Sequence, residues 1–209
     1  MDNSLIRVGI LGGSFDPPHF GHLELAQTAL SAYGFIKVLM LLTPVPPHKS
    51  DNSLSKYEHR LKMLSLLIEN NPKLEICTIE SERPGPHYTL ETIRMLKLKN
   101  PEVDEYWLII GSDTFKNLRT WFKPDILLQE TKLCVAARPE FDIDYIEALK
   151  KITTLSKIEE IKQNLIPMTP KNISSTKIRK LSAKGIRPTE MTSATIIDYI
   201  LEHNLYKNH

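Results

Sequence analysis

The stretch ILGGSFDPPHFGH, residues 10–22, decides how the fold is interpreted. An apolar run over residues 6–11 leads into its two glycines, which is typical of a buried strand that ends in a tight loop. Apolar residues then recur at helical spacing over residues 23–30, and Gly34 stands where a helix would stop. The sequence therefore predicts a strand, a glycine-bearing loop and a helix in direct succession.

The same alternation of strand and helix continues along the chain. We expect strands over residues 37–43, 74–79, 105–110 and 132–137, and helices over residues 57–67 and 89–98, the second with Thr89 as its N-cap. This order predicts an α/β fold, a Rossmann-like doubly wound parallel sheet with helices on both faces. Parallel strands end at one edge of the sheet, where we expect the ligand.

The last third of the chain is less regular. Residues 142–163 are charged and moderately helical, with Lys and Glu interleaved, which predicts a solvated connection rather than a site. Two further stretches, residues 176–184 and 194–203, show helical patterns. We expect them to pack against the edge of the sheet, and the length of 209 residues suits one domain over residues 1–209.

Composition and charge exclude several classes of function. The 27 basic and 25 acidic side chains give a formal net charge of +2, which is too balanced for a protein that binds nucleic acid through its overall field. The longest apolar run, residues 38–42, is far shorter than the roughly 20 residues that cross a membrane. No secretory pattern stands at the amino terminus, and Cys77 and Cys134 lack the spacing of a zinc site or a disulfide framework. We therefore expect a cytoplasmic protein with free thiols that binds neither nucleic acid nor membrane.

The first loop has the features of an anion site. Gly12 and Gly13 let the backbone turn sharply near a phosphate, and the helix that follows presents unpaired N–H groups. His19 and His22 are three residues apart, so if the helix begins near Pro18 both imidazoles would project from one face of its first turn, with Gly21 leaving room between them. The alternative is that one histidine caps the helix and the other packs in the core. A metal site is a weaker interpretation, because no third ligand lies near.

A second stretch, ISSTKIR at residues 173–179, places three hydroxyls at the start of a helical pattern. Such hydroxyls cap a helix or hold phosphate oxygens. Residues 171–187 carry six basic side chains and no acidic one, which fits a local polyphosphate site. The alternative is an ordinary basic helix face behind a serine cap.

The two stretches together resemble the ATP-binding motifs of bacterial nicotinate mononucleotide adenylyltransferases, members of the nucleotidyltransferase superfamily. Residues 10–22 are similar to the family's Gly-x-Phe-Asp-Pro-x-His-x-Gly-His, and residues 173–179 to its Ile-Ser-Ser-Thr-x-x-Arg. PPHK at residues 46–49, GSD at residues 111–113 and the pair Leu118 and Trp121 resemble further elements of the family. HYTLET at residues 87–92 matches its Ser-Tyr-Thr-x-Asp-Thr except at His87 and Glu91. Ser193 stands near the position where the family usually has a proline, and a serine there can cap the last helix equally well.

By this resemblance, the candidate residues fall into three groups. The catalytic residues would be His19, His22 and Lys49. The ATP-binding residues would be Gly12, Gly13, Ser14, Phe15, Gly21, Asp113, Ile173, Ser174, Ser175, Thr176 and Arg179, so that the C-terminal helices over residues 171–206 complete the ATP site. The substrate-binding residues would be Tyr88, Thr89, Trp121 and Arg138, with Trp121 stacking on the pyridine ring.

The resemblance implies adenylyl transfer from ATP to nicotinate mononucleotide, which gives deamido-NAD and pyrophosphate. Mg²⁺ would arrive with ATP, since no dedicated carboxylate cage is visible. Alternatives are an adenylyltransferase of the same fold acting on nicotinamide mononucleotide or phosphopantetheine, and a non-catalytic nucleotide-binding sensor. The preference between acid and amide, the roles of His48 and Lys49, and the oligomeric state stay open at this point, and a homo-oligomer is compatible with the sequence.

Overall fold

The computed structural model describes residues 5–45, 54–137, 142–169 and 171–207. Within these residues six parallel strands form one sheet in the order β3-β2-β1-β4-β5-β6. The strands are β1 (Arg7–Gly13), β2 (Lys37–Leu42), β3 (Leu74–Cys77), β4 (Glu105–Gly111), β5 (Lys132–Ala137) and β6 (Leu165–Pro167). The order reverses between β1 and β4, which is the switch point where doubly wound folds bind their ligands. The predicted Rossmann-like parallel sheet is confirmed.

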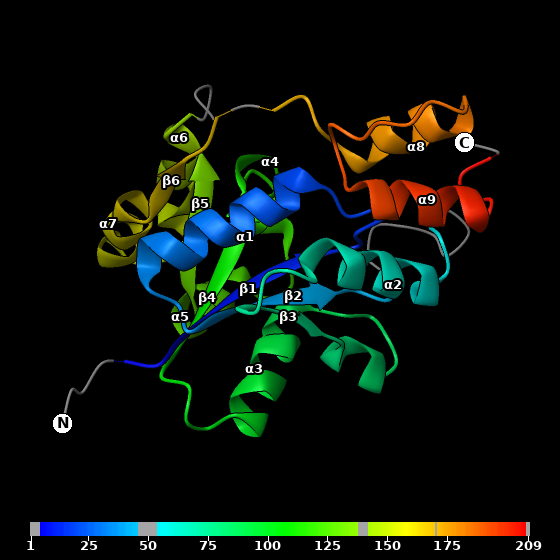
Figure 1. Ribbon diagram of the computed structural model, residues 1–209. Helices are drawn as coiled ribbons and strands as arrows, with labels where there is room; N and C mark the ends of the chain where they lie inside the picture. The colour runs from blue at the N-terminus through cyan, green and yellow to red at the C-terminus, as the bar shows by residue number, and fades with distance from the viewer. Residues whose placement is uncertain (1–4, 46–53, 138–141, 170, 208–209) are drawn as a thin grey trace.

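Helices cover both faces of this sheet, and each face buries its own core (Figure 1). Side chains alternate along the strands, so Val8 and Ile10 of β1 enter one core and Leu11 enters the other. The first core is closed by α3 (Thr89–Lys99), α5 (Pro124–Glu130) and α7 (Leu155–Gln163). The second is closed by α1 (Phe20–Tyr33), α2 (Tyr57–Ile68) and α9 (Ala194–Glu202).

Three helix ends follow from local chemistry. Gly34 ends α1 with φ of 61°, a left-handed conformation that costs glycine little, as the sequence predicts. The Ser193 hydroxyl accepts a hydrogen bond from the N–H of Ile196 at 3.3 Å, so the predicted cap of α9 is confirmed. Ser174 caps α8 (Ser175–Ala183) in the same way through the N–H of Lys177, at 3.2 Å.

Two expectations near the middle of the chain are wrong in detail. Tyr88, not Thr89, is the N-cap of α3, and no side-chain hydrogen bond caps this helix. The strand predicted over residues 74–79 stops at Cys77, and the short 3₁₀ helix η2 (Ile79–Glu82) follows it. The buried side chain of Ile79 therefore belongs to a turn that leads towards α3.

The prediction of a solvated connection over residues 142–163 is also wrong. This segment folds into α6 (Asp144–Glu147), the 3₁₀ helix η4 (Ala148–Lys151) and α7. Its apolar side chains enter the first core, while its lysines and glutamates pair outside, as in the ion pair of Lys162 with Glu147. The buried side chains are Ile146, Leu149, Ile158 and Ile161. The segment then enters β6, a strand of three residues that the sequence does not announce.

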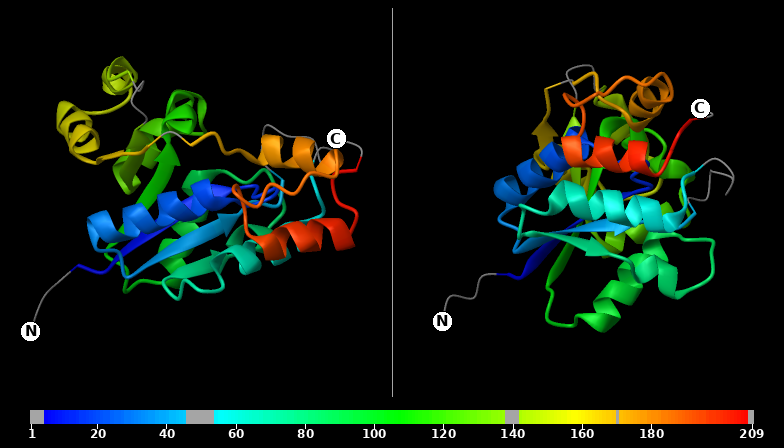
Figure 2. Two further views of the ribbon diagram at one scale, coloured as in Figure 1. Left: turned by 45° about the horizontal axis from the view of Figure 1, so that its top comes forward. Right: turned by 45° about the vertical axis from the view of Figure 1, so that its right-hand side comes forward.

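The two C-terminal helices lie at the edge of the sheet where β1 ends, and their main contacts there are with a helix and a loop rather than with a strand. α9 contacts α2, and its residues Ile196, Ile197 and Ile200 join the second core. The right-hand view in Figure 2 shows α9 lying alongside α2. α8 contacts α9 in turn, so both helices stand near the loop that follows β1. None of the helices in the described ranges is long and apolar enough to cross a membrane.

Candidate active site

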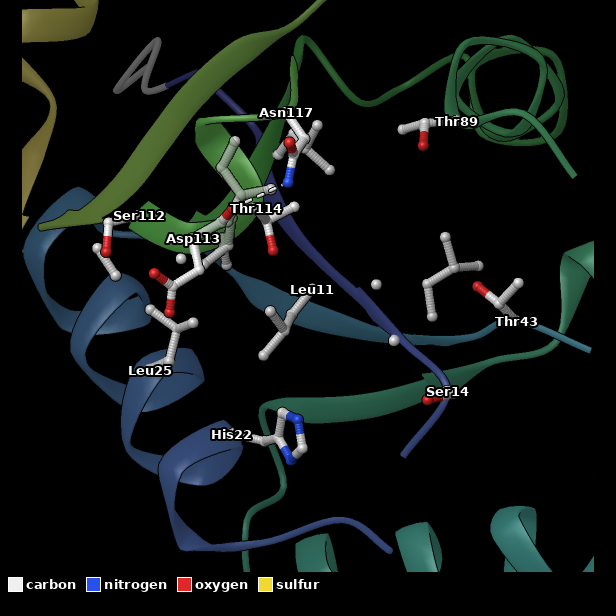
Figure 3. Close-up of a pocket in the computed structure, with 18 of the residues that line it drawn as sticks. Leu11, Ser14, His22, Leu25, Thr43, Thr89, Ser112, Asp113, Thr114 and Asn117 are labelled. Carbon is white, nitrogen blue, oxygen red and sulfur yellow. Dashed lines mark hydrogen bonds between the residues drawn. The ribbon is translucent and has the colours of Figure 1, made fainter. Parts of the chain in front are cut away.

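A cavity of about 950 Å³ opens at the carboxyl edge of the sheet, at the switch point between β1 and β4. Its volume lies in the range of pockets that enclose a small ligand. The His22 ring from α1, the Asp113 carboxyl from the short helix α4 (Ser112–Phe115) and Thr89 from α3 border the same space (Figure 3). Among the sequence-predicted residues it is lined by Gly12, Gly13, Ser14, His19, Gly21, His22, Tyr88, Thr89, Asp113, Trp121 and Ile173. The predicted ligand edge and the structural cavity therefore coincide.

The two histidines lie face to face at the start of α1. His19 is the N-cap, and its ring stacks on the ring of His22 with centroids 3.7 Å apart and planes inclined by 18°. A Cβ atom on Gly21 would lie 3.1 Å from Nδ1 of His19. Only a glycine leaves this space free without a shift of the imidazole, as the His-x-Gly-His spacing predicts.

One hydrogen bond fixes the tautomer of His22. Its Nδ1 accepts the backbone N–H of His19 at 3.2 Å, so a neutral His22 ring carries its proton on Nε2 and can donate from there. Burial, and after it the neighbouring His19, holds the pKa of His22 well below its usual value. Burial also lowers the pKa of His19 to about 4. Near neutral pH the unliganded loop therefore presents two uncharged imidazoles, and an arriving polyphosphate would favour their protonated forms.

Phe15, a predicted ATP contact, has its side chain in the second core, 1% exposed. Its ring meets the His22 ring edge-on at 5.0 Å and lies against Gly13, where a Cβ atom would come within 3.2 Å of it. The Phe15 ring therefore packs against the loop of residues 14–22 that carries both histidines, the histidine loop. Only the main chain of Phe15 is available to a nucleotide.

The second predicted motif reaches the same loop from α8. The hydroxyl of Ser175 donates to the carbonyl oxygen of Pro17 at 2.8 Å, and Nη1 of Arg179 donates to that of Asp16 at 2.7 Å. Ser174 caps α8, and Arg179 also contacts the hydroxyl of Thr176 at 3.5 Å. Two stretches about 160 residues apart in sequence thus meet, although in the described part of the chain Ser174, Ser175, Thr176 and Arg179 stand behind the loop and do not line the cavity.

Aromatic rings gather at the other side of the cavity, which is the side expected to bind the pyridine nucleotide. Tyr88 stacks on Phe122 with ring centroids 4.3 Å apart and planes inclined by 15°. Trp121 lines the cavity and packs against the first core from the end of the 3₁₀ helix η3 (Leu118–Thr120). The sequence singles out Tyr88 and Trp121 but not Phe122, whose stacking depends on a contact across 34 residues.

Polar groups behind these aromatic rings are buried with part of their hydrogen-bonding capacity unused. Oε1 of Glu80 accepts the hydroxyl of Thr92 at 2.7 Å, whereas its Oε2 has no partner among the described residues. Arg83 pairs with Glu91 at 3.1 Å, yet its Nε and Nη2 are likewise without a protein partner in the described ranges. His87 lines the cavity and is 8% exposed, and its Nδ1 also has no partner among the described residues.

Arg60 is the main site residue that sequence reasoning misses. Its guanidinium group, 2% exposed, donates to the carbonyl oxygens of Ser14 at 2.9 Å and Thr43 at 2.8 Å, and also to those of Pro44 and Ser55. The loops after β1 and β2 are thereby fixed to the start of α2. The sequence does contain a signal that Arg60 is buried, because this residue lies on the same face of α2 as the buried residues Met63, Leu64 and Leu67.

Some predicted residues cannot be placed. Lys49, with the neighbouring residues 46–48, and Arg138 lie outside the described residues. Within the described ranges no three histidine, cysteine or acidic side chains are grouped so as to hold a metal ion. Cys77 and Cys134 are both buried free thiols, as predicted.

Comparison with known proteins adds independent findings. A family model described as cytidylyltransferase-like matches residues 10–181. A protein of Shewanella woodyi named "Probable nicotinate-nucleotide adenylyltransferase" is 35% identical over 97% of this chain and 100% of its own length. One of the same name from Lactococcus lactis is 38% identical over 96% of this chain and 95% of its own.

Among solved structures, this chain is similar to a Plasmodium falciparum nicotinic acid mononucleotide adenylyltransferase complexed with NaAD. The two superpose with a TM-score of 0.76 at 21% identity, over 98% of each chain. A second structure of that protein, complexed with APC, gives a TM-score of 0.73 at 20% identity over the same shares. At such identities the likeness establishes the fold.

Proposed function

The chain belongs to the nicotinate-nucleotide adenylyltransferases of the cytidylyltransferase-like family, and we propose that it transfers the adenylyl group of ATP to nicotinate mononucleotide. The observation that carries the proposal is the stacked pair of His19 and His22 at the cavity, beside the loop that the first turn of α8 holds. The second motif contributes Ile173 to the cavity wall and holds the loop that carries the two imidazoles.

The reaction needs positioning more than proton transfer. A phosphate monoester is already ionised near neutral pH, with a second pKa of about 6, so its oxygen can attack without a general base. That oxygen of nicotinate mononucleotide forms a bond to the α-phosphorus of ATP. The bond from this phosphorus to the bridging oxygen breaks, and pyrophosphate leaves with the electron pair. Deamido-NAD is the other product.

The histidines then stabilise the negative charge that grows on the phosphoryl oxygens. His22 donates from Nε2, since its Nδ1 is occupied by the N–H of His19. The N–H of Gly21 at the start of α1 and the two glycines at the end of β1 cradle the phosphates, because the N–H groups of Phe20 and His22 already donate to backbone carbonyls of the protein. We propose that Lys49 helps to stabilise this negative charge and that Arg138 binds the acceptor nucleotide. Mg²⁺ would enter bound to ATP.

The acceptor is assigned to the aromatic side of the cavity. Trp121 and the stacked pair of Tyr88 and Phe122 offer flat faces for a pyridine ring. The first turn of α3 offers backbone N–H groups to a carboxylate, which favours the nicotinate form over the amide. The Plasmodium falciparum relative is described as bound to NaAD, the dinucleotide that this reaction would form. We place the reaction in the cytoplasm, in keeping with the two free thiols.

The test is pyrophosphate release from ATP and Mg²⁺ with three acceptors supplied in parallel. We expect nicotinate mononucleotide to be used best, with nicotinamide mononucleotide and phosphopantetheine well behind. A preference for phosphopantetheine would reassign the enzyme within the same fold. Absence of pyrophosphate with all three acceptors would leave a nucleotide-binding sensor and overturn the proposal.

A further inference from the structure

The segment Asp16-Pro17-Pro18, which leads directly into His19, is held by groups from the far end of the chain. Its three successive carbonyl oxygens accept hydrogen bonds from Arg179 at 2.7 Å, Ser175 at 2.8 Å and Thr192 at 2.9 Å. Neither proline has an N–H with which to fix itself. The position of the histidine loop therefore depends on side chains of α8 and of the turn before α9.

The carboxyl group of Asp16 is the innermost part of this contact. Asp16 is 1% exposed and Tyr206 is 6% exposed. Oδ1 of Asp16 accepts the Tyr206 hydroxyl at 2.7 Å, and Oδ2 accepts the N–H of Ser55 at 3.3 Å. Burial and the nearby carboxyl of Asp16 keep the pKa of Tyr206 well above its usual value, so the phenol retains its proton and donates.

The backbone on both sides of this hydrogen bond is strained. Phe15, the neighbour of Asp16, has φ of 46°, and Tyr206 itself has φ of 65°. Bulky side chains rarely adopt such left-handed conformations, and they persist only where the surroundings determine them. The fold thus accepts two unfavourable backbone conformations next to the bond that joins residues 16 and 206.

We propose that Tyr206 is a positioning residue for adenylyl transfer, acting through its hydrogen bond to the Asp16 carboxyl to hold His19 and His22 in place. The proposal rests on the proposed function. Without the hydroxyl, Oδ1 of Asp16 loses its partner inside the protein, and the segment that precedes His19 shifts to find another. Because reacting groups misplaced by about 1 Å can lose about 10²-fold in rate, a small shift lowers turnover.

The variant Tyr206→Phe removes the hydroxyl and keeps the ring. We expect kcat to fall about tenfold, while KM for nicotinate mononucleotide changes little, because the aromatic side of the cavity is untouched. The matched control is Tyr199→Phe. Tyr199 lies on α9, and its hydroxyl contacts Nδ1 of His59 on α2 at 2.9 Å, away from the histidine loop. This control should keep the wild-type kcat.

Two further measurements separate the positioning role from general loosening. In a chain that already carries Asp16→Ala, Tyr206→Phe should change kcat by less than about twofold, since both residues act through one bond. The imidazole NMR signals of His19 and His22, recorded without substrates, should shift in Tyr206→Phe and stay in place in Tyr199→Phe.

The outcomes distinguish this proposal from the proposed function. An unchanged kcat in Tyr206→Phe, equal losses in both tyrosine variants, or imidazole signals that do not move would each overturn the positioning role. If the wild-type protein itself releases no pyrophosphate, the proposed function fails, and the NMR comparison still decides whether Tyr206 holds the histidine loop.

Discussion

The two walls of the cavity differ in how completely their buried polar groups are paired. Residues 14–22, called the nucleotide wall because we propose that they bind ATP, have four carbonyls and the Asp16 carboxyl bound by Arg60, Ser175, Arg179, Thr192 and Tyr206. The acceptor wall, residues 79–88, buries Glu80, Arg83 and His87 with atoms that find no partner in the described chain. The first wall is fixed by the protein apart from Nδ1 of His19, whereas the second has four buried atoms without a partner among the described residues.

This difference matches what each wall has to do. Charge develops at the α-phosphorus, and groups that stabilise such charge work best when they are already in place. An acceptor must enter and be recognised, and polar groups without a protein partner can form new hydrogen bonds with the correct ligand. We therefore expect changes on the nucleotide wall to act on rate and stability, and changes on the acceptor wall to act on acceptor affinity.

The most severe disruption of the nucleotide wall is His22→Ala. Loss of the Nε2 donor should lower kcat by about 10²–10³-fold, the effect of removing one donor to a developing charge. The protein should stay folded, because His22 lines the cavity and belongs to neither hydrophobic core. Steady-state kinetics with a thermal melt measure both quantities. Near-normal turnover would remove His22 from the mechanism.

Arg60→Lys tests whether the fixed wall depends on one guanidinium group. Lysine keeps the charge but cannot reach four carbonyls at once, so the free energy of unfolding should fall by about 2 kcal/mol. Urea denaturation measures the loss. Arg94→Lys is the matched control, since Arg94 is an exposed arginine paired with Glu130, and it should be close to neutral. Equal losses would show that the buried carbonyls find other donors.

Trp121→Ala acts on the opposite wall. Loss of the indole face should raise KM for nicotinate mononucleotide about tenfold, the value of a good aromatic stacking contact, and leave KM for ATP nearly unchanged. Initial rates at varied concentrations of each substrate measure this. A parallel rise in both constants would make Trp121 a structural residue and weaken the contrast between the walls.

Because His19 on the nucleotide wall is held uncharged, the stability of the protein should also depend on pH. The folded protein keeps His19 neutral down to a pKa of about 4, whereas the unfolded chain takes up a proton near pH 6.5. Between these two pH values protons bind to the unfolded chain and favour unfolding. The contribution of His19 to the free energy of unfolding is therefore present above pH 6.5 and is lost as the pH falls towards 4. We expect a loss of about 1 kcal/mol between pH 6.5 and 5.5. Urea titrations should show a flatter profile for His19→Asn, and an equal slope would contradict the assignment.

The smallest effect is expected for Glu80→Gln on the acceptor wall. Glutamine keeps an acceptor for the hydroxyl of Thr92 and replaces an oxygen that has no partner in the described chain. The free energy of unfolding should therefore rise slightly, by less than about 1 kcal/mol. A loss of about 2 kcal/mol instead would show that Oε2 is satisfied in solution and that the acceptor wall is as fixed as the other.

The sequence predicted the features whose causes are local. Five of the six strands, the glycine that ends α1 and the serine that caps α9 follow from patterns within a few residues. The proximity of His19 and His22 follows in the same way from their spacing and from Gly21, whereas the stacking of their rings is seen only in the structure. The position of the cavity followed from topology, because parallel strands end together.

The rest depended on contacts between distant parts of the chain. Nothing near Arg60 in the sequence indicates that its guanidinium group binds four carbonyls from two loops. The buried face of residues 142–163 was hidden by the lysines and glutamates between its isoleucines, and β6 is too short to show a period. Ser175 and Arg179 were expected on phosphates, and only the fold shows them donating to the histidine loop.

The hydrogen bond between Asp16 and Tyr206 joins residues 190 positions apart. A nascent polypeptide leaving the ribosome therefore carries its histidine loop long before the residues that hold it have been synthesised. Native contacts of such long separation form late, because so much of the chain must be ordered first. A translation product that stops short of residue 206 would retain both imidazoles and lack the tyrosine that binds Asp16, so such a partial chain should consume ATP more slowly than the 209-residue chain.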